Sequence, residues 1–429
     1  MGKGLKNFRV ALKAMETASK ASSGRLTILG LTSIGHFVND GNMWLIPGII
    51  LPALNQMGVN YALIGLISAL YAAVSALASP LVPLSIRWFK GHMRAMAVGM
   101  FLWAFAIGLA SIGFYIRNIP LIALGVVLAG IGGAYYHPVG SALLSATYGG
   151  NAGLALGVNG AFGSLGRTLY PFIGSVLIFA GAVGAFYRLW ILALVTALIG
   201  IGVLTYGILK FDVGAVGGFR DPAKGSSISL KVSIYLIVLL TIITLLRNAA
   251  GQGIQTFLGI YINKVLGIRL SLTYGEVLSL ILAFAIVGQP LLGYLSDKAG
   301  RRLMASLSTI LFALFFIAFA YTNNLAFIIL SMMFVLSNFP LIMAIVGDLF
   351  PREQVSWATS IVWNVAVTGG NVLGSALAGA LAQFYVPIYG EVDALKYALL
   401  TMMSLAFTSG ILWVMVPKPP KRSRVPLFG

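Results

Sequence analysis

Residues 191–209 read ILALVTALIGIGVLTYGIL, nineteen residues without one charged side chain. Such a run approaches the roughly 20 apolar residues that an α-helix needs to cross a lipid bilayer. Only 9% of the 429 residues are charged and 59% are hydrophobic, whereas a soluble domain carries roughly 25% charged residues. The composition therefore predicts a multi-pass membrane protein. Because alternating strands of about ten residues are missing from the sequence, we expect helices rather than a β-barrel.

Twelve apolar segments of this kind can be assigned along the chain. They are predicted at 26–55, 61–86, 93–116, 120–148, 152–180, 186–209, 232–262, 272–297, 302–322, 325–349, 355–383 and 394–416. The polar, Gly-rich stretch 211–230 separates six segments from six and reads as a linker. We therefore expect one six-helix bundle over 25–210 and a second over 231–417, with a leader at 1–24 and a basic tail at 418–429.

The basic charge of the chain is distributed unevenly. The net charge is +18, from 28 Lys and Arg against 10 Asp and Glu. If the N-terminus is cytoplasmic, 21 of the basic residues lie in cytoplasmic segments, 5 lie outside and 2 lie within spans. This asymmetry follows the positive-inside rule and predicts a cell-membrane protein with both termini in the cytoplasm. The charge then meets anionic lipids at the cytoplasmic face, and we do not expect a nucleic-acid partner.

The leader has an amphipathic pattern. Leu5, Phe8, Leu12 and Met15 share one helical face, while lysines occupy the others. This pattern predicts an interfacial helix on the cytoplasmic surface, with a disordered tail as the alternative. The sequence contains no cysteine, so disulfides are excluded.

The two halves of the chain resemble each other. A shift of 209 residues pairs Asn39 with Asn248 and Gly58 with Gly267, and after a short insertion Tyr61 pairs with Tyr274. Parallel repeats of six spans are typical of secondary transporters, whose substrate binds between the halves near the middle of the bilayer.

A loop motif connects this repeat to a known family. Residues 293–302 read GYLSDKAGRR, and Gly293, Asp297, Gly300, Arg301 and Arg302 resemble the cytoplasmic gate motif of the major facilitator superfamily of secondary transporters. The first-half counterpart, SIRWFKGHMR at 85–94, keeps the basic residues but has no acid. The resemblance implies an all-α membrane protein of twelve helices in two pseudo-symmetric halves, which transports rather than catalyses.

Shorter matches resemble one branch of that superfamily. HFVND at 36–40, YALIG at 61–65 and GIGGAYYHP at 130–138 are similar to the fosmidomycin-resistance branch of drug efflux carriers. The resemblance favours export. In that branch an acid usually follows the His-Pro pair, whereas Val139 stands here, so the substrate of the branch is not carried over.

Three charged residues lie deep within predicted spans. At 1.5 Å per residue, Asp40, Arg167 and Arg247 are each roughly 21 Å from the cytoplasmic end of their helix. An ionised group at the centre of a lipid-facing helix costs about 2.5–3.5 kcal/mol, so these groups must face a watery cavity or one another. The repeat places Asn39-Asp40 opposite Arg247-Asn248, which predicts that acid and base meet between the halves. We expect Asp40 to couple protons, with Arg247 as its partner or as an anion clamp; a structural ion pair is the alternative.

Two histidines and Arg167 are expected to act together with Asp40. His36 lies one helical turn before Asp40 and can relay its proton, or can bond a neighbouring carbonyl instead. His137 precedes Pro138, which we expect to break the hydrogen-bond ladder of span four and expose carbonyls near the middle of the bilayer, so that His137 lines the cavity or bonds to that backbone. Arg167 follows the small-residue stripe of Gly160, Gly163 and Gly166, and its guanidinium suits a carboxylate or phosphate. Two arginines against one acid favour an anionic substrate.

Aromatic and amide residues within the spans complete the predicted substrate site, although each one alone is more often a packing residue. They are Asn39, Trp44, Tyr71, Tyr136, Asn159, Asn248, Gln252, Trp363 and Asn364.

The sequence fits functions other than anion transport less well. The sequence has no Walker loop and no nucleophile–base pattern, so we expect neither an enzyme nor a cofactor. A divalent metal carrier could use His36, Asp40 and His137, but two arginines oppose a cation and we expect no metal. A lysolipid flippase and a proton/carboxylate uptake symporter remain alternatives. We predict a monomeric, proton-coupled carrier of a small organic or amphipathic anion, working by alternating access and favoured as an exporter.

Overall fold

The computed structural model describes residues 2–148, 152–179, 185–207, 209 and 230–418. Every regular element in this part of the chain is a helix. Ten stretches are long and apolar enough to cross a bilayer, and the last of them, Trp357–Met415, turns back on itself at Gly390. Because α1 (Gly2–Leu45) supplies one more crossing, the prediction of an all-α protein with twelve spans is confirmed.

The first half contains spans one to six. Its elements are α1 (Gly2–Leu45), η1 (Ile46–Ile50), α2 (Leu51–Gln56), α3 (Tyr61–Ala78), η2 (Ser79–Leu81), α4 (Val82–Trp88), α5 (His92–Tyr115), α6 (Ile119–Tyr148), α7 (Ala152–Phe179), η4 (Phe186–Leu189), α8 (Trp190–Gly202) and η5 (Val203–Gly207). Span one is therefore α1, η1 and α2, and Pro47 and Pro52 lie at the starts of its last two pieces. Proline removes a backbone donor, which explains the change of helix type there.

The second half contains spans seven to twelve. Its elements are α10 (Leu230–Lys264), α11 (Leu272–Ala299), α12 (Arg301–Thr322), α13 (Leu325–Ser337), α14 (Phe339–Leu349), α15 (Arg352–Ile361), η6 (Val362–Thr368), α16 (Gly369–Leu412) and η7 (Trp413–Met415). Span ten is divided into α13 and α14. Spans eleven and twelve meet within α16, where Gly390 has a positive φ of 76°. The helices run up to this turn, so the predicted limits at 383 and 394 were too short.

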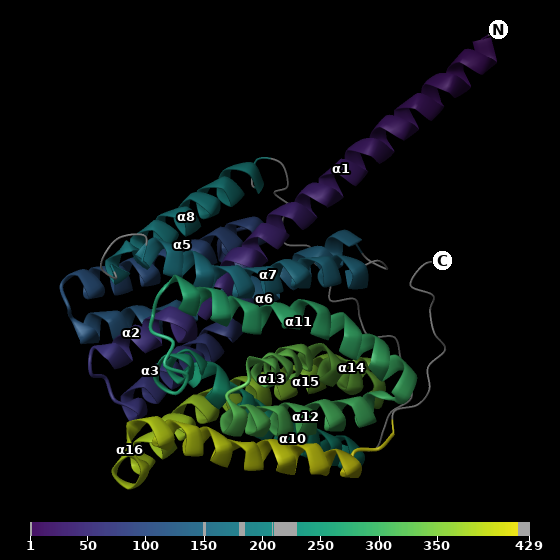
Figure 1. Ribbon diagram of the computed structural model, residues 1–429. Helices are drawn as coiled ribbons and strands as arrows, with labels where there is room; N and C mark the ends of the chain where they lie inside the picture. The colour runs from purple at the N-terminus through teal and green to yellow at the C-terminus, as the bar shows by residue number, and fades with distance from the viewer. Residues whose placement is uncertain (1, 149–151, 180–184, 208, 210–229, 419–429) are drawn as a thin grey trace.

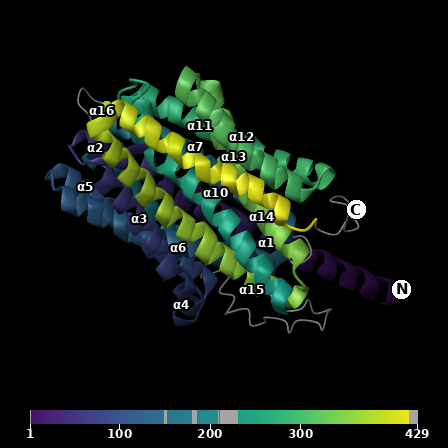
Figure 2. The same cartoon turned by 90° about the horizontal axis from the view of Figure 1, so that it is seen from below.

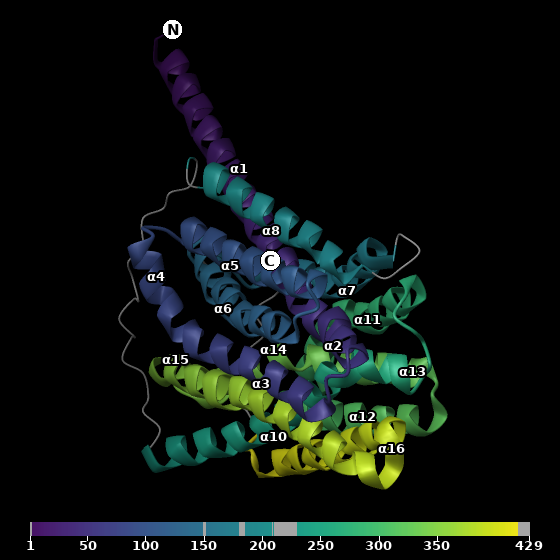
Figure 3. The same cartoon turned by 90° about the vertical axis from the view of Figure 1, so that its left-hand side faces the viewer.

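The two halves lie side by side (Figure 3), with the first half in purple to teal and the second in teal-green to yellow. The start of α1 and the C-terminal end of α16 lie towards one end of the bundle, and α2 and the turn of α16 lie at the other (Figures 1 and 2). The backbone of α1 continues straight out of the bundle towards the N-terminus (Figure 1). The side chains of the predicted leader stripe, nearly all of the linker, and the tail from 419 lie outside the described residues, so these predictions remain open.

The turns that follow spans one and seven support the internal repeat. Gly58 has φ of +90° and Gly267 has φ of +68°, a conformation that side chains with a Cβ rarely adopt. The two positions paired by the shift of 209 residues therefore have the same backbone role.

Glycines allow the halves to touch along α3 and α16. A Cβ added at Gly65 would lie 2.5 Å from the carbonyl oxygen of Ser375 and 2.9 Å from Cα of Gly379. One turn further along α3, the hydroxyl of Ser68 lies 3.1 Å from that of Ser375 and 3.2 Å from that of Thr256. We call Gly65, Ser68, Ser375 and Gly379 the α3–α16 seam. Small residues at a helix crossing permit this close approach.

The repeat-paired tyrosines also join the halves. Tyr61 donates its hydroxyl to the carbonyl of Glu391 at 2.9 Å, and its amide donates to Oε1 of Gln383 at 3.2 Å. Tyr274 donates its hydroxyl to the carbonyl of Gly48 at 2.5 Å. Each tyrosine thus bonds the backbone of the opposite half. These contacts hold the bundle together at the end away from the termini.

Candidate functional site

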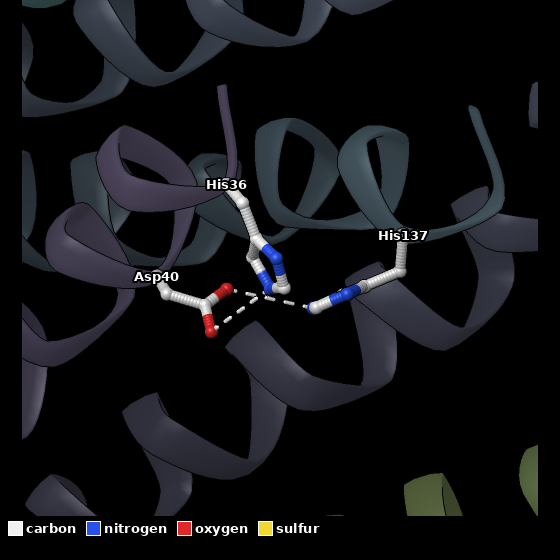
Figure 4. Close-up of side chains that lie close together, drawn as sticks. All are labelled: His36, Asp40 and His137. Carbon is white, nitrogen blue, oxygen red and sulfur yellow. Dashed lines mark ion pairs between the residues drawn. The ribbon is translucent and has the colours of Figure 1, made fainter. Parts of the chain in front are cut away.

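Asp40 on α1 is the centre of a buried polar cluster. Its carboxylate is only 2% exposed, and three basic side chains approach it. His36 Nε2 lies 3.4 Å from Oδ2, and Arg167 Nε on α7 lies 3.5 Å from the same oxygen. His137 Nε2 on α6 lies 3.6 Å from Oδ1. Figure 4 shows the two imidazoles and the carboxylate pointing towards one another. We call these four residues the Asp40 cluster.

Asn39 and Trp103 hold the carboxylate in place. The Nδ2 of Asn39 donates to Oδ1 of Asp40 at 3.0 Å, and its Oδ1 accepts from the indole N–H of Trp103 at 2.9 Å. Both ends of the amide are therefore in use, and Asn39 is 4% exposed. The prediction that Asn39 binds substrate is not supported by this geometry, because it positions Asp40 instead. Trp103, on α5, was not predicted from the sequence as part of the site, because its position within an apolar span is its only distinguishing feature.

His36 is fixed by side chains from two other helices. Its Nδ1 lies 2.9 Å from Oδ1 of Asn159 on α7, and its ring stacks on Tyr136 of α6 with centroids 4.6 Å apart. The hydroxyl of Tyr136 donates to the carbonyl of Thr32 at 2.7 Å. The ring is thus oriented by side chains, not by the neighbouring carbonyl that was the alternative. Asn159 and Tyr136, both predicted as site residues, lie in the cluster's surroundings.

The glycine stripe of α7 makes room for the cluster. A Cβ at Gly163 would lie 2.4 Å from Nε2 of His36, and one at Gly166 would lie 2.0 Å from the carbonyl oxygen of Phe37. At Gly160 an added Cβ would meet nothing within 4 Å. The predicted close helix approach is confirmed for two of the three glycines.

The members of the cluster differ in exposure. The side chain of His137 is 42% exposed, whereas those of His36 and Arg167 are 12% and 15% exposed. His137 is therefore the member that a solute or proton reaches first. Arg167 is paired with Asp40 and donates from Nη2 to Oγ of Ser164 at 2.9 Å, so it does not turn outward to the headgroups.

Three of these side chains carry metal-binding atoms. One ligand atom from each of His36, Asp40 and His137 lies within 4.8 Å of the others, and such donors suit a transition metal. The guanidinium of Arg167 contacts the same carboxylate and opposes a second cation there. The electrostatics favour a proton over a divalent metal at this place.

Arg247 does not reach Asp40, and the predicted acid–base pair between the halves is wrong. Its Nη2 donates to the carbonyls of Phe334 and Val335 at 3.0 and 2.9 Å, and its Nη1 donates to Oδ1 of Asn248 at 3.1 Å. All of these acceptors belong to the second half. The nearby break in span ten supplies carbonyls to Nη2, so both terminal nitrogens of Arg247 have acceptors without a carboxylate, while its buried Nε has no partner among the described residues.

The other predicted residues of the second half also bond locally. Gln252 donates to Oγ1 of Thr256 at 3.3 Å, and Asn364, on the exposed side of η6, donates to the carbonyl of Ser360 at 3.0 Å. Trp363 is half-buried in η6. In the first half, Trp44 is 2% exposed within the hydrophobic core and is a packing residue, and Tyr71 lies beside the ring of Trp103.

Pro138 removes one backbone donor from span four without ending the helix. α6 runs from Ile119 to Tyr148 through Pro138 without interruption. His137 therefore reaches the cluster from a continuous helix.

The gate motif forms a compact turn between α11 and α12. Gly300 has φ of +98°, and Arg301 begins α12. Nη1 of Arg301 lies 2.6 Å from Oδ2 of Asp348, and Nη2 lies 3.5 Å from Oδ1 of Asp297. Arg302 donates to the carbonyl of Val416 at 2.7 Å, whereas Gly293 lies in open space. The structure therefore brings three of the five predicted residues, Asp297, Gly300 and Arg301, together with Asp348.

Two six-helix bundles, with a buried charged cluster inside the first of them, are typical of a secondary membrane transporter. A family model described as Major Facilitator Superfamily matches residues 32–285 and 240–428, and the chain belongs to this superfamily. The resemblance inferred from the loop motif is confirmed.

The curated relatives include efflux proteins. The chain is 24% identical over 301 residues to the Fosmidomycin resistance protein of Escherichia coli (strain K12), covering 67% of this chain and 69% of that one. It is 24% identical over 395 residues to the Uncharacterized MFS-type transporter YfnC of Bacillus subtilis (strain 168), covering 87% and 94%. The Multidrug resistance protein MdtG of Proteus mirabilis (strain HI4320) is 29% identical over 147 residues, which cover 33% of this chain and 36% of that one.

Solved structures share the fold. The nucleoside transporter NupG aligns with a TM-score of 0.72 at 13% identity, covering 91% of this chain and 99% of that one. A bacterial homologue of the human lysosomal transporter Spinster, inward-facing and occupied, aligns with a TM-score of 0.71 at 14% identity, covering 91% and 96%.

Proposed function

We propose that this protein is a proton-coupled secondary transporter that carries a small organic or amphipathic anion across the cell membrane, in the direction of export. The observation that carries the proposal is the buried carboxylate of Asp40 among two imidazoles and a guanidinium. Ionisable groups inside membrane spans are expensive and usually mark proton or substrate pathways. The efflux proteins among the relatives support export.

Proton binding and anion binding are linked through Arg167. When Asp40 is ionised, its charge holds the guanidinium of Arg167. A proton that enters through the exposed His137 and neutralises Asp40 releases Arg167, whose planar fork then suits a carboxylate or phosphate. Departure of the anion restores the pair and expels the proton.

This linkage also favours a second candidate, a proton/anion symporter for uptake. Because a proton on Asp40 frees Arg167, proton and anion assist each other's binding, and cotransport in one direction is the simplest result. Cotransport of one proton with one monoanion moves no net charge, so the membrane potential, worth about 2.3 kcal/mol per elementary charge per 100 mV, neither drives nor opposes it. The direction of proton movement separates the two candidates.

Alternating access requires the halves to separate where they now touch. The α3–α16 seam and the bonds of Tyr61 and Tyr274 close the end away from the termini. With both termini in the cytoplasm, the closed end is the outer one, which is the end that an inward-facing carrier keeps closed. Rocking of the halves then opens the seam to the outside.

Flux in proteoliposomes with a pH-sensitive dye in the lumen tests the proposal. Fosmidomycin is the first probe because a relative is named for resistance to it, followed by simple carboxylates and phosphonates. We expect an added anion gradient to move protons. An exporter that works by antiport moves protons in the direction opposite to the anion, whereas a symporter moves them in the same direction as the anion. Asp40→Asn should abolish the proton movement. Unchanged proton movement in this variant would refute the role of Asp40.

A further inference from the structure

Span ten is interrupted in the middle of the second half. α13 ends at Ser337, α14 begins at Phe339, and Asn338 between them is fully buried. Pro340 has no amide N–H, so the carbonyl of Leu336 loses the donor that a continuous helix would supply. A carbonyl without a donor is costly within a membrane, so the break requires partners from elsewhere.

Side chains from two other helices supply these partners. Nη2 of Arg247 on α10 donates to the carbonyls of Phe334 and Val335 at 3.0 and 2.9 Å. Nε2 of Gln289 on α11 donates to the carbonyl of Leu336 at 3.3 Å. Three consecutive carbonyls at the end of α13 therefore each accept a hydrogen bond from a side chain of another helix. The positive guanidinium also lies at the negative end of the α13 dipole.

The second piece of span ten is held by a different helix. Nδ2 of Asn338 donates to Oγ of Ser308 on α12 at 2.6 Å. Towards the other end of α14, Arg301 of α12 donates from Nη1 to the carbonyl of Ala344 at 3.1 Å and pairs with Asp348. These polar contacts attach α14 to the start of α12. They attach α13 to α10 and α11, and also to a later part of α12, where Oγ of Ser331 donates to the carbonyl of Phe312 at 2.9 Å.

We propose that span ten is hinged at Ser337–Asn338, that Arg247 and Gln289 cap the fixed piece, and that α14 moves together with the gate motif of α12. The hydrogen bonds of both caps stay intact when α14 changes its angle to α13, so bending the span breaks no backbone bond. Arg247 is then a positioning residue for the hinge and does not bind the transported anion. This inference does not depend on which solute is carried.

A double-mutant cycle on the thermal midpoint in lipid nanodiscs tests the cap. Gln289→Leu should lower the midpoint by roughly 2 °C, because the carbonyl of Leu336 loses its donor. In a Pro340→Ala background the new backbone amide can donate to the carbonyl of Leu336. Gln289→Leu should therefore lower the thermal midpoint by less than half as much in this background. Gln255→Leu is the matched control, because Gln255 donates to Gly251 within its own regular helix, and its effect should be equal in both backgrounds. Arg247→Lys should also lower the thermal midpoint, because the single ammonium group of lysine cannot reproduce the hydrogen bonds that the two terminal nitrogens of the guanidinium donate.

Distance measurements by electron spin resonance test the hinge itself. The chain has no cysteine, so labels at Ala326→Cys on α13 and Leu349→Cys on α14 report without background. We expect a broad distance distribution that Pro340→Ala narrows. If Gln289→Leu lowers the thermal midpoint equally in both backgrounds, the proposed cap is wrong. If Pro340→Ala leaves the distance distribution unchanged, the proposed hinge is wrong.

Discussion

Asp40 and Arg247 occupy neighbouring positions of the same repeat, yet their surroundings are opposite. Asp40 is held by charged and titratable side chains from three helices, whereas Arg247 is held by neutral carbonyls of one broken helix. The paired asparagines serve both: Asn39 donates to the acid, and Asn248 accepts from the base. An amide can support either charge, so the paired asparagines can serve an acid that follows one of them and a base that precedes the other. We infer that transport chemistry is confined to the first half and that the second half provides a moving scaffold.

The largest expected effect comes from removing the charge in the first half. Asp40→Asn should reduce substrate-driven proton movement to the level of empty liposomes, because no carboxylate remains to take the proton. Arg247→Lys, its counterpart in the second half, should retain transport with a lower thermal midpoint. Equal losses of proton movement in the two variants would erase the contrast between the halves.

A crosslink across the seam tests whether the two halves must part. The hydroxyls of Ser68 and Ser375 are 3.1 Å apart, so Ser68→Cys combined with Ser375→Cys should form a disulfide on oxidation. Transport should then fall to background and return when reductant is added, because a closed seam prevents alternating access. Each single cysteine variant should transport normally under both conditions. A crosslinked protein that still transports would contradict the rocking of the halves.

Glycine substitutions on α7 probe the packing around His36. Gly163→Ala places a methyl group 2.4 Å from Nε2 of His36, so the ring must move away from Asp40. We expect a loss of about 1–3 kcal/mol in stability together with severely reduced transport. Gly160→Ala is the matched control: its methyl group meets nothing, and alanine favours the helix by up to about 1 kcal/mol. Similar transport rates for the two variants would show that the position of His36 is unimportant.

The smallest effect is expected at Trp103, which contacts Asn39 rather than Asp40 itself. Trp103→Phe removes the donor to Oδ1 of Asn39 and should cost roughly 0.5–1.5 kcal/mol, measured by chemical or thermal unfolding. Transport should slow moderately, because the amide that orients Asp40 becomes less well fixed. Wild-type transport and stability in this variant would remove Trp103 from the site.

The fold could be predicted from the sequence because bilayer thickness and backbone hydrogen bonding dictate long apolar helices. The cluster was predicted in part: His36 and Asp40 share a helical face, and the glycine stripe implied that α7 packs closely. The partner of Arg247 could not be predicted, because equivalence in a repeat does not determine which residues touch. Pro138 does not end α6, whereas span ten is divided just before Pro340. A proline alone does not reveal whether neighbouring helices can satisfy the carbonyls of a break.

The central claim is that the first half alone carries the ion chemistry, and paired arginine variants test it most directly. Substrate-driven proton movement should be measured in liposomes for Arg167→Gln and Arg247→Lys at equal amounts of folded protein. The account predicts that Arg167→Gln abolishes the movement while Arg247→Lys retains most of it. Loss in Arg247→Lys together with wild-type movement in Arg167→Gln would contradict the account.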